Sequence, residues 1–396
     1  MTATSTEGHR GNHASHGPQA LFRLITGHIC LHSAMAGMRM AAPLFALHEG
    51  YSPLSVGVLL ALFSLVPVFL AIPAGRYADR HGLRRPIGWG VVVASAGAAL
   101  AVAFPRFEVL CLSAMCVGGA TGVSVIALQR HVGRAAANAL ELKRVFSWLS
   151  LGPAISNFLG PVAAGLLIDH AGFRAAFLLC ALLPLLAWFW VRNAQELPPA
   201  PAAQGGVTAQ VWSLLRDATM RRLLIVNWLL SSCWDVHTFV VPVLGHERAF
   251  SASVIGAILG AFAVAAACVR IALPALAHHL REWVVITTAM VVTALLFAVY
   301  PLMHSAWSMG MCSVLLGLAL GTVQPMMMST LHQITPHALH GQAIALRLMS
   351  LNLSSVVMPM LFGTAGAIVG VSVVFWTVGA VVGLGAHTAW RLRPNS

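Results

Sequence analysis

Long apolar runs separated by short polar segments dominate the pattern along the chain. A membrane-spanning helix needs about 20 mostly apolar residues. Twelve runs meet this requirement, and we predict helices at approximately 21–46, 53–74, 87–104, 107–129, 145–168, 174–191, 222–244, 253–273, 283–302, 306–327, 342–364 and 370–390. The pattern therefore predicts an all-α integral membrane protein with twelve transmembrane helices.

The composition supports this class. Hydrophobic residues make up 58% of the chain and charged residues only 9%, whereas soluble domains carry roughly 25% charged residues. The formal charge of +12 comes from residues in the short connections, without the interleaved aromatic residues of a nucleic-acid surface. We expect the lipid bilayer and a small-molecule substrate as partners, no nucleic acid, and a monomer.

Lys and Arg are distributed unequally between the two sides of the predicted membrane. With a cytoplasmic N-terminus, eighteen of the 23 basic residues fall on the inner side and three on the outer side, while Arg39 and Arg347 fall within helices. Because cytoplasmic connections are enriched in Lys and Arg, we predict that both termini are cytoplasmic, in a bacterial inner or plasma membrane. We expect Arg347 to extend toward the cytoplasmic interface.

A repeat divides the chain into two related parts. At an offset of 199 residues, Pro43 matches Pro242, Gly57 matches Gly256, Phe63 matches Phe262, Gly118 matches Gly317 and Gly122 matches Gly321. Between the copies lies the longest polar interval, rich in proline and glycine, which is typical of a linker. We predict a disordered cytoplasmic tail over 1–20, six-helix bundles over 21–192 and 221–391, a cytoplasmic linker over 193–220, and a C-terminal tail over 392–396.

The segment from Gly75 to Arg85 reads GRYADRHGLRR. Its pattern G-x-x-x-D-R-x-G-x-R-R resembles the loop between helices 2 and 3 of major facilitator superfamily transporters, with Leu83 at a position that is usually basic. The resemblance implies two six-helix bundles related by an axis along the membrane normal. It also implies a cytoplasmic gate, made by Gly75, Asp79, Arg80, Gly82, Arg84, Arg85 and Arg130.

In this gate, the Asp79 carboxylate would pair with Arg130 and cap the helix that begins near Gly341, because an anion is stabilised at a helix N-terminus. The corresponding connection in the second half, around 273–281, contains no acid at the position of Asp79. We therefore expect this gate in the first half only.

The fifth predicted helix carries a second family pattern. Its residues Gly152, Pro153, Gly160, Pro161 and Gly165 resemble the glycine-proline signature of the drug:proton antiporter branch. A single glycine ends the pattern where the usual form has two. Small residues on one face permit close helix approach, and a generic packing face is the alternative interpretation.

Asp235 is the one acidic residue in the middle of a predicted span. Ionisable residues inside a membrane cost roughly 2.5–3.5 kcal/mol on insertion scales and are functional candidates. A carboxylate in this position can exchange a proton with either side or hold a cationic substrate. The alternative is a structural acid paired with a neighbouring Arg or His.

The first predicted helix offers a complementary charge. His28, His32, Met35 and Arg39 follow each other at spacings of 4, 3 and 4 residues, which places them on one helical face. The resemblance implies that helices 1, 4, 7 and 10 line a central cavity, so this face would meet Asp235. We hypothesise that Asp235 with His32 or His28 carries the proton, and that Arg39 tunes them or contacts an anionic group.

Other polar residues extend this candidate site, namely His237, Asn227 and Gln324 on the seventh and tenth predicted helices. For each histidine, the alternative to a role in the site is a packing role. All seven cysteines fall inside apolar segments, so we predict neither a disulfide framework nor a metal site.

These features favour a proton-coupled secondary transporter that works by alternating access and exports small amphipathic organic compounds. No G-x-x-x-x-G-K-[ST] segment is present, as an ATP-driven pump would need. We therefore expect no cofactor and a proton gradient as the energy source. One alternative is a proton symporter that imports an organic anion through Arg39. A more remote alternative is a membrane-embedded enzyme or scaffold, although scattered acids and short connections make an enzyme the poorer fit.

Overall fold

Twelve long α-helices make up the computed structural model, which describes residues 18–135, 139–197, 214–276, 281–335 and 340–393. Most of the predicted tails and of the predicted linker lie outside these ranges. The helices are α1 (Pro18–His48), α2 (Pro53–His81), α3 (Arg84–Ala103), α4 (Phe107–Ala135), α5 (Ala139–Ala171), α6 (Phe173–Val191), α8 (Ala218–Glu247), α9 (Ala252–Leu276), α10 (Glu282–Val299), α11 (Ala306–Ile334), α12 (His340–Val369) and α13 (Val371–Trp390), and a 3₁₀ turn η2 (Tyr300–Leu302) follows α10.

Each predicted span falls on one of these helices. Judged by their described residues, eleven of these helices are long and apolar enough to cross a membrane. No strand occurs in the ranges that the structure describes. The predicted all-α membrane class is therefore confirmed.

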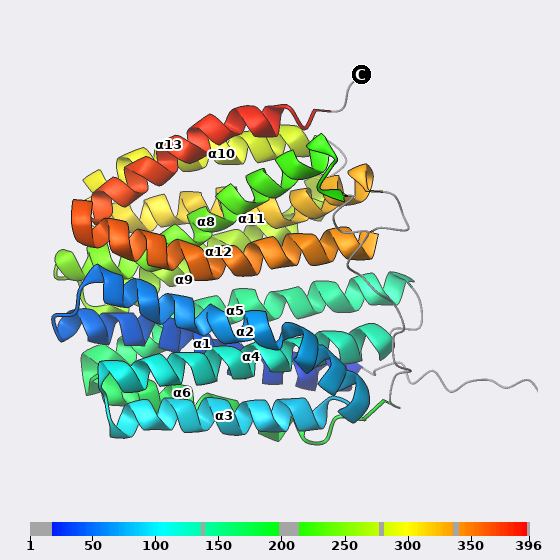
Figure 1. Cartoon of the computed structure of the whole chain (residues 1–396). Helices are drawn as coiled ribbons and strands as arrows, with labels where there is room; N and C mark the ends of the chain where they lie inside the picture. The colour runs from blue at the N-terminus through cyan, green and yellow to red at the C-terminus, as the bar shows by residue number, and fades with distance from the viewer. Residues whose placement is uncertain (1–17, 136–138, 198–213, 277–280, 336–339, 394–396) are drawn as a thin grey trace, which may run out of the picture.

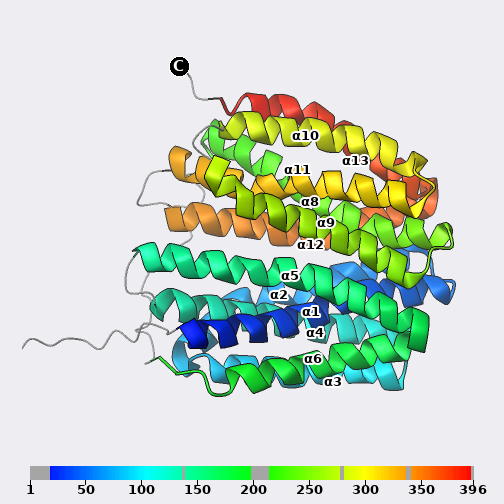
Figure 2. The same cartoon turned by 180° about the vertical axis from the view of Figure 1, so that it is seen from behind.

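The helices form two groups, α1–α6 and α8–α13, as Figure 1 and the reverse view in Figure 2 show. Successive helices run in alternating directions, so the beginning of α1 and the end of α13 lie at the same end of the molecule. We call this the terminal end and the opposite one the far end. The grouping follows the order of helices along the sequence.

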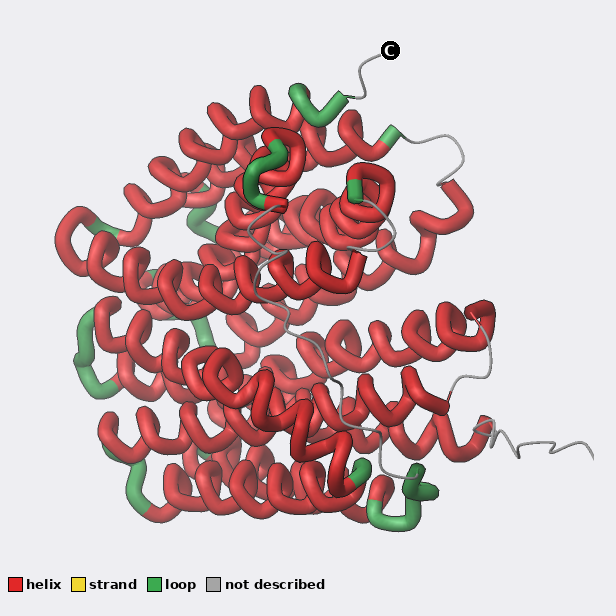
Figure 3. The backbone as a smooth tube through the Cα atoms, turned by 45° about the vertical axis from the view of Figure 1, so that its right-hand side comes forward, coloured by secondary structure: helices red, strands yellow, loops and turns green. Residues whose placement is uncertain are grey.

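The two groups meet along two helix pairs, α2 with α12 and α5 with α9. At the far end their backbones nearly touch. A side chain at Gly57 would overlap the carbonyl oxygen of Pro359, and one at Gly165 would overlap that of Ala252. We call these contacts the far-end seam. Toward the terminal end the two groups diverge (Figure 3).

The segment that we expected as a connection between two helices is mostly helical. Helix α2 continues to His81, and only Gly82 and Leu83 separate it from α3. Gly82 ends the helix with a positive φ of 75°, which glycine adopts without strain. Leu83 is fully buried in a cluster with Leu24 and Ile87, so the apolar residue at this usually basic position anchors the turn.

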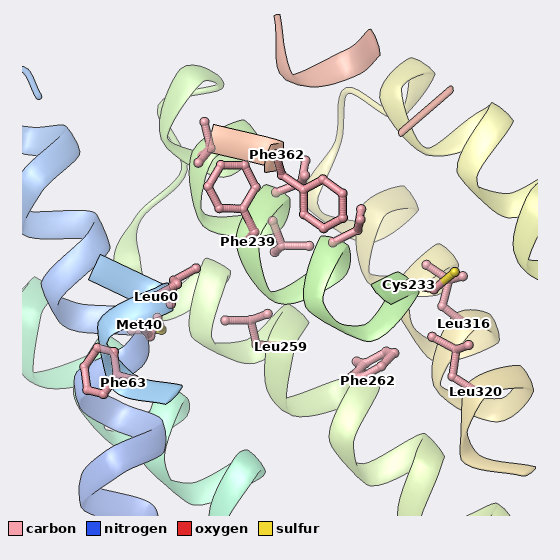
Figure 4. Close-up of a cluster of buried hydrophobic side chains, with 14 of the residues drawn as sticks. Met40, Leu60, Phe63, Cys233, Phe239, Leu259, Phe262, Leu316, Leu320 and Phe362 are labelled. Atoms are coloured by element: carbon pink, nitrogen blue, oxygen red, sulfur yellow. The ribbon is translucent and has the colours of Figure 1, made fainter. Parts of the chain in front are cut away.

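One large apolar cluster extends through both groups of helices. Figure 4 shows part of it, with Met40, Leu60 and Phe63 from α1 and α2 on one side, and Leu259 and Phe262 from α9 next to them. The cluster surrounds the level at which the charged residues of α1 and α8 lie. Ionised groups there are consequently held away from bulk water.

Candidate functional site

A small cavity of about 70 Å³ lies where α1, α5, α8 and α9 meet. Polar groups on its wall come from both halves: Arg39 from α1, Asn157 from α5, and Trp234 and Thr238 from α8. Pro161 of α5 also lines it, so the helix 5 pattern reaches the cavity. The cavity is the natural centre of the candidate site, because residues from both halves reach it.

Asp235 lies beside this cavity. Its side chain is buried, with 5% exposure, and it accepts a hydrogen bond from the Ser354 hydroxyl of α12 at 3.3 Å. Arg39 and Asp235 are close enough to interact electrostatically across the two halves. Arg39 forms no hydrogen bond with a described residue. The structure thus brings the predicted acid and the predicted cation together, without a direct bond between them.

The two histidines of α1 do not reach Asp235. The His28 ring packs against Gly152 of α5, where a Cβ atom would meet its Cδ2 at 2.5 Å. The rings of His28 and His32 lie 5.6 Å apart, nearly edge to face. The buried Nδ1 of His32 has no hydrogen-bond partner, while electrostatic interactions link this ring with Arg39. Both rings sit inside the first half, on the terminal side of Arg39.

His237 points away from the cavity. Its Nε2 is 2.9 Å from the Ser313 hydroxyl of α11, which is also 2.8 Å from the Tyr300 hydroxyl. The ring stacks on Phe262 at 4.1 Å between centroids. Two residues along a helix turn the side chain by about 200°, so His237 faces the interior of the second half while Asp235 faces the boundary between the halves.

Asn227 serves a different purpose from the one expected. Its side-chain oxygen accepts a hydrogen bond from Nε of Arg347 at 3.0 Å. The expectation that Arg347 extends toward the cytoplasmic interface is wrong, because this side chain is 5% exposed and also contacts the Met328 sulfur at 3.5 Å. The amide and the sulfur supply acceptors that hold the guanidinium inside. Gln324 is exposed and does not line the cavity.

Trp234, Asn157 and Arg270 also lie at or next to the site, although the sequence did not mark them as site residues. The Cζ atom of Arg270, on α9, lies 5.5 Å from the centre of the Trp234 ring, and this ring also contacts Phe262 edge to face at 4.5 Å. Arg270 falls inside the predicted span 253–273. That position was a usable signal, but its closeness to the end of the span led to its assignment to the cytoplasmic side.

The predicted gate residues gather at the terminal end. A side chain at Gly75 would meet the Arg130 guanidinium at 2.8 Å, so the end of α4 packs directly on α2. The side chain of Asp79 and those of the first residues of α12 lie outside what the structure describes. The predicted capping contact therefore stays a prediction.

The remaining gate residues surround a surface pocket of about 440 Å³, namely Arg80, Gly82, Arg84 and Arg85. Glu196 closes it and was not predicted. Its carboxylate accepts hydrogen bonds from the backbone N–H groups of Leu83 at 2.8 Å and Arg84 at 2.7 Å. It thereby satisfies the first turn of α3, which otherwise lacks acceptors.

The helix 5 pattern faces two neighbours. Gly152 and Gly160 lie against α1 within the first half, whereas the carbonyl of Pro161 and the Cα of Gly165 approach α9 of the second half. The carbonyl of Pro161 would overlap a side chain at Gly256. The pattern therefore forms part of the far-end seam as well as part of a bundle.

Asp169 strengthens this seam. Its two carboxylate oxygens accept hydrogen bonds from the backbone N–H groups of Ala252 at 2.9 Å and Ser253 at 2.8 Å, at the beginning of α9. Although partial burial raises it, these hydrogen bonds hold the pKa of Asp169 below its usual value. A carboxylate from one half thus caps a helix of the other.

The sequence profile of the Major Facilitator Superfamily matches residues 24–333, and again 223–396. The chain belongs to this superfamily. It is therefore a membrane transporter and not an enzyme. The second match begins within α8, as expected for a protein whose halves are related.

The relatives agree with this assignment. The multidrug resistance protein MdtG of Salmonella typhimurium is 25% identical over 336 residues, covering 79% of this chain and 80% of its own length. The protein of the same name from Salmonella paratyphi A is 26% identical over the same length. Among solved structures, a mutant of the nucleoside transporter NupG superposes with a TM-score of 0.78 at 13% identity, covering 94% of this chain and 100% of that one.

A POT family transporter in complex with 5-aminolevulinic acid also superposes, with a TM-score of 0.77 at 14% identity, covering 93% of this chain and 95% of that one. These structural likenesses show the fold.

Proposed function

We propose that the chain is a proton-coupled exporter of small amphipathic organic compounds that works by alternating access. The observation that carries this proposal is the position of Asp235, a buried carboxylate at the boundary between the halves that interacts with Arg39 of the other half. The helix 5 pattern at the far-end seam supports an antiporter. The name of the MdtG relatives supports export of drug-like compounds.

The charge of Asp235 couples the proton to the movement of the halves. While the carboxylate is ionised, it attracts Arg39 and stabilises the arrangement in which the two halves approach each other. A proton on Asp235 removes this attraction, and Arg39 is then free to move with the first half. Protonation of Asp235 from one side and release to the other would thus bias which end of the molecule is open.

A second candidate is a symporter that imports an organic anion through Arg39. It is favoured by one observation: Arg39 lines the cavity and forms no hydrogen bond with a described residue. The two candidates differ in direction. Accumulation in inverted vesicles, driven by an acidic interior, supports export, whereas accumulation in right-side-out vesicles, driven by an acidic exterior, supports import.

The decisive variant is Asp235→Asn, which keeps the size of the side chain and removes its charge. We expect accumulation driven by a pH gradient to be lost in proteoliposomes, while exchange of labelled for unlabelled compound without a gradient continues. Glu108→Gln, which removes an exposed acid at the far end, is the matched control and should behave as the native chain. Undiminished proton coupling in Asp235→Asn would refute the proposal.

A further inference from the structure

The neighbourhood of Trp234 holds a cation that the proposed proton coupling does not use. We propose that Arg270 and Trp234 form a subsite for an amphipathic organic anion. The exported compound places a carboxylate, sulfonate or phosphonate group on Arg270 and a flat apolar part against the Trp234 ring. The inference rests on the proposed function, because this subsite adjoins the same cavity, and it specifies the charge of the substrate.

Arg270 lacks the acceptors that a guanidinium needs. Its side chain is half-buried, and its Nε atom is buried without a hydrogen-bond partner. It forms neither a hydrogen bond nor an ion pair with any described residue. A guanidinium carries five N–H donors, and leaving buried donors unpaired is unfavourable. An anion from solution would supply the missing acceptors.

Other arginines show what a paired guanidinium looks like in this protein. Arg347 donates to Asn227 and contacts Met328, and Arg248 donates to the carbonyl oxygen of Pro301 at 2.7 Å. The Arg39 charge is balanced by that of Asp235. Arg270 has only the face of an indole as its neighbour. Among these four it is the one without an oxygen acceptor or an acid.

The charges inside the membrane point in the same direction. The described membrane-spanning helices place Arg39 and Arg347 in the interior and Arg270 within the last two turns of α9, whereas Asp235 is the one acid at these levels. This interior therefore carries an excess of positive charge, which is costly in a medium of low dielectric constant. Binding an anion reduces the excess, whereas binding a cation increases it.

Trp234 supplies the surface for the apolar part of the substrate. Its ring lines the cavity and is held by the edge-to-face contact with Phe262. Arg270 lies over the indole, and a guanidinium stacked on an aromatic ring keeps its N–H donors for another acceptor. The subsite thus offers charge and apolar surface side by side, which is what an amphipathic anion requires.

Gln324 lies at the same level. Gly321 of α11 packs on Ala266 of α9, and one helical turn farther toward the terminal end both helices present polar residues, Gln324 and Arg270. Gln324 is exposed, so its amide is accessible to a compound that enters from the terminal end. This placement puts a neutral donor and acceptor on the helix next to the one that carries Arg270.

The test compares three probes that share one ring system: naphthalene-2-sulfonate, naphthalene-2-sulfonamide and 2-naphthylmethylammonium. Their binding to the purified full chain in phosphatidylcholine nanodiscs is measured by equilibrium dialysis without a pH gradient. We expect the sulfonate to bind roughly tenfold more tightly than the sulfonamide, as for a hydrogen bond to a charged group, and the ammonium to bind most weakly.

In Arg270→Gln the preference for the sulfonate should fall to about twofold or less, while sulfonamide binding persists and shows that the chain is folded. Arg270→Lys should keep part of the preference. Arg393→Gln is the matched control, because Arg393 lies over the ring of Trp283 at 5.8 Å, far from the cavity. It should keep the full preference.

Equal or tighter binding of the ammonium in the native chain would overturn the inference, as would an unchanged sulfonate preference in Arg270→Gln. Because dialysis uses no gradient, its outcome is independent of proton coupling. Loss of coupling in Asp235→Asn together with no preference for the sulfonate would leave the proposed function standing and reject the subsite. The reverse result would reject the coupling and keep the subsite.

Discussion

The far-end seam and the level of Arg39, Asp235 and Arg270, which we call the charged middle, are built from different interactions. In the seam, Gly57 and Gly165 bring backbone against backbone, and the main charged group, Asp169, is satisfied by two N–H groups. In the middle, Arg39 and Arg270 form no hydrogen bonds with described residues. The charged group of the seam has hydrogen-bond partners within the protein, whereas these two guanidinium groups of the charged middle have none among the described residues.

This difference indicates that closure of the two halves at the far end and binding of the ligand depend on different parts of the molecule. Contacts between backbones need no particular side-chain conformation, so they can form and break repeatedly at low entropic cost. A guanidinium without a hydrogen-bond partner, such as that of Arg270, does not hold the halves together through hydrogen bonds, but it offers strong ones to a ligand that arrives.

The largest effect is expected for Gly165→Leu. The new side chain would collide with the carbonyl of Ala252, and overpacking costs about 1–3 kcal/mol or more. The ratio of molecules closed at the far end to molecules open there should fall by roughly 5- to 150-fold, and transport with it. In a cysteine-free background, spin labels at residues 49 and 305, both exposed and at the far end, should report longer distances.

Gly310→Leu is the control for this substitution, because no atom lies within 4 Å of a Cβ added there. It should leave the label distances unchanged. A Gly165→Leu protein with native distances and native transport would mean that the seam is not closed by backbone contact, and the contrast with the charged middle would disappear.

Asn227→Leu sharpens the description of the middle. It removes the oxygen that accepts from Arg347, and a hydrogen bond to a charged group contributes about 1.5–3 kcal/mol. We expect the free energy of unfolding to decrease by about this amount in urea titrations in mild detergent. Adding Arg347→Met should restore much of the loss, because apolar residues can replace a buried charged pair. Stability unaffected by Asn227→Leu would show that the hydrogen bond from Arg347 to Asn227 does not stabilise the fold.

Asp169→Asn should have the smallest effect. An exposed anion at a helix N-terminus contributes about 0.3–1 kcal/mol, so the ratio of closed to open molecules at the far end should fall by roughly two- to fivefold. Because the bonded state lowers the pKa of Asp169, its contribution is present above the usual value of about 3.9 and is lost as pH falls through the lowered value. The label distances at residues 49 and 305 should therefore not change between about pH 5 and 8, and a transition within that range would contradict the assignment.

The sequence predicted the twelve helices because about 20 apolar residues in a row have few alternatives to a membrane helix. The predicted helices were too short where several of them reach the terminal end of the molecule. Helix α2 continues to His81, α4 to Ala135 and α11 to Ile334. Helix geometry continues beyond the apolar part wherever arginine, alanine and similar helix-forming residues follow, and a rule based on apolarity does not detect this.

Asp235 and Arg39 were found because charged residues are rare inside membranes, which makes each one informative. The orientations of their neighbours were less predictable. His237 directly precedes Thr238, which lines the cavity. The His237 side chain nevertheless hydrogen-bonds to Ser313 inside the second half. Arg270 and Trp234 come from different helices, and their contact depends on how α8 and α9 rotate against each other. That rotation is set by side-chain packing and leaves no local pattern in the sequence.

Glu196 has a practical consequence for work with separated halves. The residue follows α6, yet it is fastened to the start of α3 by two hydrogen bonds and lies 3.8 Å from Nε of Arg84. The beginning of the connecting segment therefore travels with the first six helices as one piece. A cut made for co-expression of two fragments has to fall after Leu197, since a break before Glu196 would remove both the cap of α3 and the carboxylate beside Arg84.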